Sequence, residues 1–274
     1  MTATEGAARV SGPPSGTGAP LLELRGIEKR FGAVEVLKGV DFTVHPGEVM
    51  SLVGDNGAGK STLIKCVAGI HPIDGGEVVY DGEVVHIHGP KESARLGIEV
   101  VYQDLALADN LDVVQNMFLG REDTYGPLRQ LDETTMEQRA SDTLKSLSVT
   151  TLSSVRQTVA GLSGGQRQSV AVAKAVMWNS RLVILDEPTA ALGVAQTRQV
   201  LDLVRRLADR GLAVVIISHN LHDVFEVADR ITVLRLGQGV ALFEREQTTQ
   251  QEVVHAITAG QLVHVPGMAA EVVA

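Results

Sequence analysis

The spacing of hydrophobic residues predicts short strands that alternate with helices. Runs that are apolar, or that alternate with period two, occupy residues 48–53, 77–80, 98–102, 182–185, 213–217 and 231–234. Between the later runs, residues 194–209 and 221–228 carry their apolar residues at helical spacing. Alternation of this kind predicts an α/β fold in which helices cover a mostly parallel sheet.

Residues 104–178 interrupt this alternation. They hold few β-branched runs and three stretches with helical spacing, at 113–119, 132–147 and 164–178. We therefore expect a helical subdomain at about 104–178, inserted into one domain that spans 21–260. Residues 1–20 are rich in Gly, Pro, Ser, Thr and Ala and predict a disordered arm, whereas residues 261–274 have no clear period and predict a docked or frayed tail.

Composition and charge exclude several classes of protein. The longest apolar run, 212–217, is far shorter than the roughly 20 residues that cross a bilayer, so we expect no membrane span. The net charge of −9 argues against nucleic acid as a partner. Because Cys66 is the one cysteine, neither an intrachain disulfide nor a cysteine-rich zinc site can form, which favours a reducing compartment such as the cytoplasm.

A glycine-rich segment follows the first of the apolar runs. It reads Gly54-Asp55-Asn56-Gly57-Ala58-Gly59-Lys60-Ser61 and matches the phosphate-binding pattern G-x-x-x-x-G-K-[ST], directly before a helical stretch at 62–68. In such a loop the N–H groups and the helix N-terminus face phosphate oxygens. Lys60 would then hold the β- and γ-phosphates and Ser61 would ligate Mg²⁺. The alternative, an ordinary glycine-rich turn, is disfavoured by the strand-loop-helix setting.

Two consecutive carboxylates end the run at 182–185. Paired acids at the end of a buried strand are costly unless a cation meets them. Beside a phosphate-binding loop, Asp186 is expected to hold Mg²⁺ and Glu187 to accept a proton from, or to orient, an attacking water. Taken alone, an Asp-Glu-Pro sequence is more typical of a solvated loop.

A third motif, Leu162-Ser163-Gly164-Gly165-Gln166, begins the helical stretch at 164–178. Ser163 is a suitable N-cap, but each glycine in the first turn costs about 1 kcal/mol relative to alanine. Close approach of the backbone N–H groups to an anion would offset that cost. We therefore predict a second phosphate-binding helix start here.

With these three motifs, residues 21–260 resemble the nucleotide-binding subunits of ATP-binding cassette (ABC) transporters. The resemblance implies a P-loop NTPase whose ABC core sheet carries an inserted α-helical subdomain and an antiparallel β region. It also implies ATP and Mg²⁺ as cofactors, and a head-to-tail homodimer in which each ATP lies between the loop of one subunit, extended to Thr62, and residues 163–166 of the other.

Three further positions match the family. Phe31 would stack on adenine, Gln103 would contact Mg²⁺ and the reacting groups, and His219 would contact the γ-phosphate. Each also has an ordinary alternative: Phe31 as a core residue, Gln103 as an amide at a strand end, and His219 as a neighbour of the helix-capping Asn220.

One position departs from the family pattern. Where that pattern reads roughly S-A-L-D, this chain has Ala190-Ala191-Leu192-Gly193. Without this carboxylate, the polar link across the dimer that the resemblance implies at this loop is not expected. Its effect is either a lower ATPase rate or only a change in loop flexibility.

Between a transport motor and a soluble ABC ATPase that acts on ribosomes or DNA, the chain favours transport. Residues 103 and 163 are too close in sequence for a long coiled-coil insertion, and the net charge is acidic. The segments 47–65, 110–120 and 217–220 resemble those of monosaccharide importers of the ribose, xylose and fructose type. Expected partners are therefore transmembrane permease subunits at the cytoplasmic face and, indirectly, a solute-binding protein. A non-sugar cargo remains the alternative.

Three expectations concern other segments. Residues 104–120, which contain Leu, Ala, Val and Met, are expected to form the docking groove for the permease, with a core role as the alternative. His86 and His88 are expected on one face of a strand, where they would form a weak metal site at best, and Cys66 is expected to be a small buried residue rather than a reactive thiol.

Overall fold

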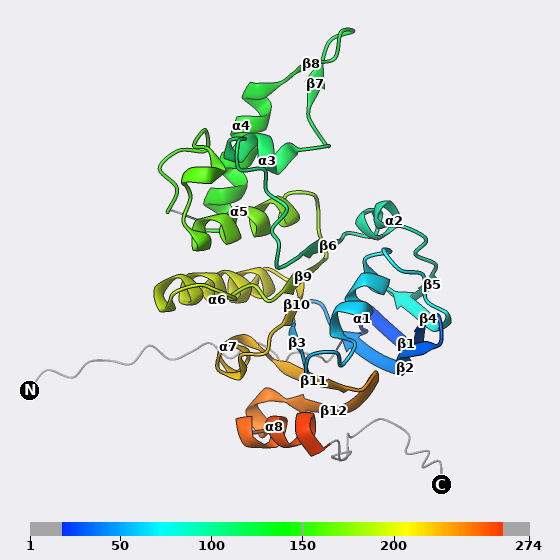
Figure 1. Cartoon of the computed structure of the whole chain (residues 1–274). Helices are drawn as coiled ribbons and strands as arrows, with labels where there is room; N and C mark the ends of the chain where they lie inside the picture. The colour runs from blue at the N-terminus through cyan, green and yellow to red at the C-terminus, as the bar shows by residue number, and fades with distance from the viewer. Residues whose placement is uncertain (1–17, 150, 260–274) are drawn as a thin grey trace, which may run out of the picture.

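The centre of the computed structural model, which describes residues 18–149 and 151–259, is a six-stranded sheet (Figure 1). Its strands lie in the order β12-β11-β3-β10-β9-β6, and every neighbouring pair is parallel except β11 and β12. The strands are β3 (Val49–Val53), β6 (Ile98–Val101), β9 (Leu182–Asp186), β10 (Ala213–Ile217), β11 (Arg230–Arg235) and β12 (Gln238–Glu244). The predicted α/β fold with a mostly parallel sheet is confirmed.

A second, four-stranded antiparallel sheet flanks the first, in the order β2-β1-β4-β5. It consists of β1 (Leu22–Phe31), β2 (Val34–Val44), β4 (Gly75–Tyr80) and β5 (Glu83–Val85). The apolar pattern predicted only β4. Shifts of register interrupt the pairing of β1 with β2, and such irregularities break the strict alternation that identifies a strand in sequence.

Helices and the second sheet bury both faces of the central sheet. Val214 and Ile216 of β10 pack with helices α3, α5 and α6, whereas Val215 and Ile217 pack with α1 and the antiparallel sheet. The helices are α1 (Lys60–Val67), α2 (Pro90–Arg95), α3 (Val113–Phe118), α4 (Glu133–Ser146), α5 (Gly164–Val176), α6 (Val194–Asp209), α7 (Leu221–Val227) and α8 (Gln250–Ala259). A strand buried on both faces reads as a continuous apolar run, which explains why β10 was predictable.

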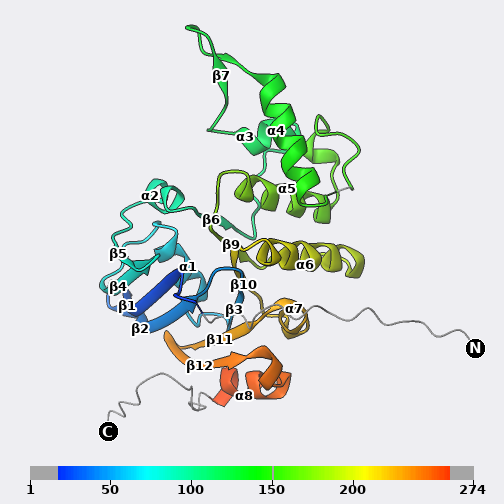
Figure 2. The same ribbon diagram turned by 180° about the vertical axis from the view of Figure 1, so that it is seen from behind.

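Helices α3, α4 and α5 form the green lobe at the top of Figure 1, and Figure 2 shows the same lobe from behind. Their bounds agree with the three predicted helical stretches to within two residues. The lobe also holds a small hairpin, β7 (Thr124–Tyr125) and β8 (Gln130–Leu131), which the sequence pattern did not predict because each strand has only two residues. Two 3₁₀ turns, Val159–Gly161 and Arg245–Gln247, complete the elements.

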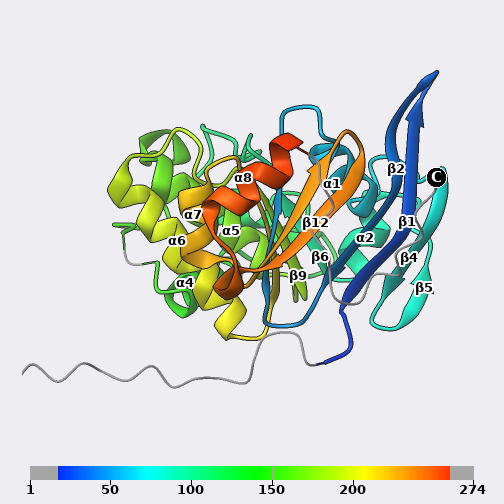
Figure 3. The same cartoon turned by 90° about the horizontal axis from the view of Figure 1, so that it is seen from below.

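The C-terminal helix α8 packs on strands β11 and β12, at the edge of the central sheet (Figure 3). Most of the predicted arm, and all of the predicted tail, lie outside the described residues. Within 18–149 and 151–259, no helix has the length and apolar character needed to span a bilayer.

The expected strand around His86 and His88 is wrong, because β5 ends at Val85 and both histidines lie in the irregular segment that follows. Their rings nevertheless stack, with centroids 6.2 Å apart. Cys66 is buried in α1, and burial raises the pKa of its thiol to about 11. A thiol held protonated at neutral pH agrees with the predicted unreactive role.

Candidate active site

The glycine-rich loop connects β3 to α1, as predicted. Gly54 has a φ of 150°, and a Cβ added there would lie 2.0 Å from the carbonyl oxygen of Leu234 on β11. Only glycine therefore fits at the point where the loop leaves the sheet. The loop then turns back on itself through a hydrogen bond from the Ala58 N–H to the Asp55 carbonyl, 3.1 Å long.

Lys60 is the first residue of α1 and is buried, with 8% of its surface exposed. Its Nζ donates to the carbonyl oxygens of Gly54 and Asp55, so the ammonium group lies inside the curve of the loop. Burial lowers the pKa of Lys60, and the charges of Glu187, Asp55 and Asp186 oppose this effect. Ser61, which is exposed, and Thr62, which is partly buried, follow in the first turn of the helix.

Asp186 is the last residue of β9, and Glu187 follows it. Burial, and then the neighbouring charge of Glu187, raise the pKa of Asp186, while Lys60 and Lys65 lower it. Glu187 has a φ of 51°, in the left-handed region, which costs an L-residue roughly 1–2 kcal/mol. Its N–H donates to the carbonyl oxygen of Ile217 at 2.9 Å, so β10 helps to hold this strained backbone.

A cavity of about 450 Å³ brings together predicted residues that are far apart in the sequence. Residues 54–56 at the start of the phosphate-binding loop line it, together with Gln103, Glu187 and His219, whereas Phe31, Lys60, Ser61 and Asp186 are not among the lining residues. His219 Nδ1 lies 2.8 Å from a carboxylate oxygen of Glu187, while 71% of the histidine side chain stays exposed. A polar cavity with a carboxylate, an imidazole and part of a glycine-rich loop is suited to phosphoryl transfer to water.

Ser163 caps α5 as predicted, because its hydroxyl accepts from the N–H of Gln166 at 3.3 Å and the Gln166 side chain accepts from the Ser163 N–H at 2.8 Å. The two glycines have a packing role that sequence reasoning missed. A Cβ on Gly164 would lie 2.9 Å from Leu192, and one on Gly165 would lie 3.1 Å from the Cβ of Gln196 on α6. Residues 163–166 do not line the cavity of their own chain.

Phe31 ends β1, and 44% of its surface is exposed. Its ring makes an edge contact with the ring of His71, with centroids 5.1 Å apart. This exposure excludes the core role that was the alternative for Phe31, and Lys29 Nζ lies over the ring, 5.5 Å from its centroid.

Comparison with known proteins identifies the family. The family model described as ABC transporter matches residues 37–190, more than half of the chain. The chain belongs to the ABC transporter family. It is an ATPase cassette that binds and hydrolyses ATP.

The chain is 45% identical to the fructose import ATP-binding protein of Rhizobium meliloti, over 87% of this chain and 94% of that protein. It is 44% identical to the xylose/arabinose import ATP-binding protein of Sulfolobus acidocaldarius, with the same two coverages. A ribose import ATP-binding protein of Escherichia coli O157:H7 is 42% identical over 86% of this chain, but this chain spans only 46% of that relative.

Solved structures of cassettes share the fold. The ADP conformation of an ATP-binding cassette of an ABC transporter is 26% identical, with a TM-score of 0.76, and the match covers 90% of this chain and 98% of that one. A dimeric, post-hydrolysis cassette bound to ADP and Pi is 25% identical, with a TM-score of 0.67, and the match covers 82% of this chain and 98% of that one.

In this ABC cassette, Gly193 is the N-cap of α6, with a φ of −74° that any residue can adopt. A Cβ added there meets no atom within 4 Å. The backbone therefore does not require glycine, and an aspartate would fit. Nothing in the structure of this subunit explains why the family's carboxylate is absent.

Residues that sequence reasoning missed also lie in or beside the cavity of the cassette. Ser218, Leu221 and Ile257 line it. Thr189, two residues after Glu187, is hydrogen-bonded to Asp223 of α7. Ser218 and Leu221 could have been suspected as neighbours of His219, but no sequence pattern links Ile257 to the loop or Thr189 to Asp223.

Proposed function

We propose that this cassette is the ATP-hydrolysing subunit that drives import of a monosaccharide through separate membrane subunits at the cytoplasmic face of the membrane. The hydrolytic role is supported by the cavity where Glu187 and His219 lie beside residues 54–56 of the phosphate-binding loop. The names of the fructose, xylose/arabinose and ribose import relatives support the cargo class. A solute-binding protein that delivers the sugar to the membrane subunits would be an indirect partner.

In this proposal each residue of the site has one role toward ATP. Lys60 and the N–H groups of residues 54–62 hold the β- and γ-phosphates, and Phe31 stacks on the adenine. Glu187 accepts the proton of the attacking water, and His219 contacts the γ-phosphate. The short Glu187–His219 contact supports this division, because it places an acceptor and a donor side by side in the cavity.

Mg²⁺ is the proposed metal, held by Ser61, Gln103 and Asp186. Hydroxyl, carboxylate and amide oxygens are ligands that Mg²⁺ accepts, and it usually takes its remaining ligands from phosphates and water. The pKa of Asp186 is raised by burial and by Glu187, so a cation would relieve an electrostatic cost at this position. When bound, Mg²⁺ would neutralise charge on the β- and γ-phosphates.

The proposed assembly is a homodimer. The capped helix start at residues 163–166 does not line the cavity of its own chain, and Ser163 and Gly164 are exposed. A second copy would bring this helix start to the phosphates held by the first. The dimeric cassette among the solved structures supports this arrangement.

The proposed permease contact lies next to the segment 104–120. Several apolar residues of the segment 104–120 belong to the core: Val113, Val114, Met117 and Phe118 each have at most 1% of their surface exposed. Leu119 is exposed, however, and the following Arg121 lines a second cleft of about 440 Å³ together with Pro90, Lys91, Ala94 and Arg95. We propose that this basic cleft and Leu119 receive the permease.

Replacing Glu187 by glutamine tests the hydrolytic role. The amide has nearly the same shape but is a very poor proton acceptor, and loss of a positioned base costs about 10²- to 10⁴-fold in rate. Steady-state ATPase activity should fall by that factor, while binding of a fluorescent ATP analogue is retained. Glu83→Gln, at an exposed position on β5, is the matched control. Hydrolysis at the parental rate by Glu187→Gln would contradict the assignment.

Uptake measurements test the cargo. Cells in which a Lys60→Ala chain replaces the parent should lose uptake of labelled fructose, xylose or ribose, because the motor no longer binds nucleotide productively. If uptake of a non-sugar solute is lost while uptake of all three sugars is unchanged, the proposed cargo class is wrong. Unchanged uptake of every solute would favour a non-transport ATPase.

A further inference from the structure

The backbone at Glu187 needs support from its surroundings. Its left-handed conformation is strained, and a strained residue keeps its conformation only where neighbouring groups hold it. On the N-terminal side, the Glu187 N–H donates a hydrogen bond to the carbonyl oxygen of Ile217 at 2.9 Å. On the C-terminal side, the first side chain with a hydrogen bond to another element is that of Thr189.

Thr189 Oγ1 donates to Asp223 Oδ2 at 2.6 Å, a short bond to a charged group. Asp223 has only 3% of its surface exposed, and the ring nitrogen His222 Nδ1 is 3.9 Å from Oδ1, beyond hydrogen-bond distance. A buried carboxylate is costly unless a donor meets it. Asp223 lies in the first turn of α7, where the helix dipole also favours its charge, and four residues after His219.

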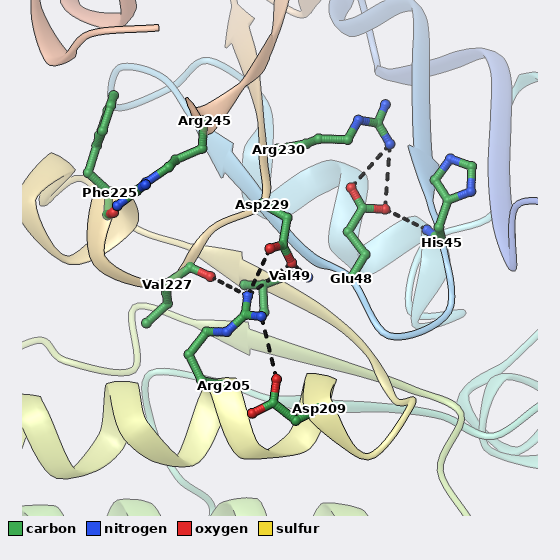
Figure 4. Close-up of polar contacts among 10 residues, drawn as sticks. All are labelled: His45, Glu48, Val49, Arg205, Asp209, Phe225, Val227, Asp229, Arg230 and Arg245. Carbon is green, nitrogen blue, oxygen red and sulfur yellow. Dashed lines mark hydrogen bonds and ion pairs between the residues drawn. The ribbon is translucent and has the colours of Figure 1, made fainter. Parts of the chain in front are cut away.

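The other end of α7 is attached to the base of the sheet (Figure 4). Arg205 of α6 donates to the carbonyl oxygen of Val227 at 2.9 Å and pairs with Asp229 at 2.9 Å. Asp229 in turn accepts from the N–H of Val49, at the start of β3, at 2.8 Å. With its C-terminal end fixed, α7 meets the loop after Glu187 through Thr189 and Asp223.

We propose that Thr189 and Asp223 are positioning residues for ATP hydrolysis. Their hydrogen bond joins the loop that carries Glu187 to the helix that follows His219, and so maintains the 2.8 Å contact between the carboxylate and the imidazole. The inference rests on the proposed roles of Glu187 and His219. It adds two residues that do not line the cavity and act through that pair.

The first test compares Thr189→Val, which loses the hydroxyl, with Thr189→Ser, which keeps it. In the full-length chain, kcat for MgATP should fall about 10- to 100-fold in Thr189→Val, the range for losing a hydrogen bond to a charged group. KM should stay the same, because β3, its loop and α1 are not involved. Thr189→Ser should retain most of kcat. Thr248→Val removes a similar hydroxyl-to-carboxylate hydrogen bond, 2.9 Å long, to the exposed Glu252 of α8, and should leave both constants unchanged.

A second test separates positioning from a general loss of structure. If Thr189 acts through the Glu187–His219 pair, Thr189→Val should cause no further loss of kcat in a His219→Ala background. An equal loss in both backgrounds, or a Thr189→Ser variant as poor as Thr189→Val, would overturn the inference. Asp223→Asn, which keeps an acceptor but removes the charge, should show an intermediate kcat and provides the test if Thr189→Val does not fold. If Thr189→Val has the kcat of the parent while Glu187→Gln is inactive, this inference is refuted but the proposed function stands.

Discussion

Glu48, just before β3, should make the stability of the cassette depend on pH. Its side chain is fully buried and lies 3.1 Å from Arg230, while its other oxygen accepts from the N–H of His45 at 2.7 Å (Figure 4). Burial raises the pKa of Glu48 from 4.5 to about 7, although Arg230 and the bond from His45 lower it. Between pH 4.5 and about 7 the folded chain therefore keeps a proton that the unfolded chain has lost. The free energy of unfolding should fall as the pH rises through this window.

The size of the effect follows from the same interval. At about 1.4 kcal/mol per pH unit, the interval from 4.5 to about 7 corresponds to about 3 kcal/mol of stability. This stability is fully present below pH 4.5 and absent above about pH 7. For a domain of this size, 3 kcal/mol is worth roughly 6–12 °C in melting temperature.

The measurement is the difference in free energy of unfolding between the parent and Glu48→Gln at pH 4.5, 6 and 8. Glutamine has nearly the same shape and does not titrate, although its one amide oxygen can accept from only one of the two donors, His45 or Arg230. That loss, like the titration of carboxylates elsewhere such as Glu23 and Asp74, does not vary with pH in the difference in the way that the Glu48 proton does. We expect the parent to gain about 3 kcal/mol relative to the variant on going from pH 8 to pH 4.5. A flat difference would mean that Glu48 stays ionised. A gain toward high pH would mean that the attraction of Arg230 exceeds the cost of burial.

Three further predictions concern the dimer and its loops. Lys60→Ala and Ser163→Arg homodimers should each be nearly inactive. Mixing the two variants should restore part of the ATPase activity, because one of the two sites in the heterodimer carries neither change. An active Ser163→Arg homodimer would argue against sites that are shared between subunits. Gly193→Asp should raise the free energy of unfolding by about 0.3–1 kcal/mol in urea denaturation, since a carboxylate is a better N-cap for α6 than glycine, and a fall in stability would contradict the open space found there. Gly165→Val should lower the free energy of unfolding by about 1–3 kcal/mol, because the added side chain collides with Gln196 on α6. Thermal melting measures this loss, which does not depend on whether an anion binds at the start of α5.

How much of the site could be predicted from sequence depended on how local each interaction is. The loop at 54–61, the acids that end β9 and the cap at Ser163 each lie within one strand end, turn or helix start. The groups that give such a segment its chemistry come from consecutive residues, so a sequence pattern can identify the segment. The parallel strands were predictable for a similar reason, because burial on both faces leaves an unbroken apolar run.

The tertiary structure alone decided which of these segments meet. The order β3-β10-β9 places Glu187 beside the end of β10, and the turn after β10 brings His219 to within 2.8 Å of it. The bond between Thr189 and Asp223 spans 34 residues, and the packing of Gly165 on Gln196 depends on how α5 and α6 pack together. Such contacts depend on the order of strands in the sheet and on helix packing, which no run of neighbouring residues encodes. The sequence by itself therefore determined which groups are available for chemistry, and the packing of α5, α6 and α7 around the sheet determined their distances.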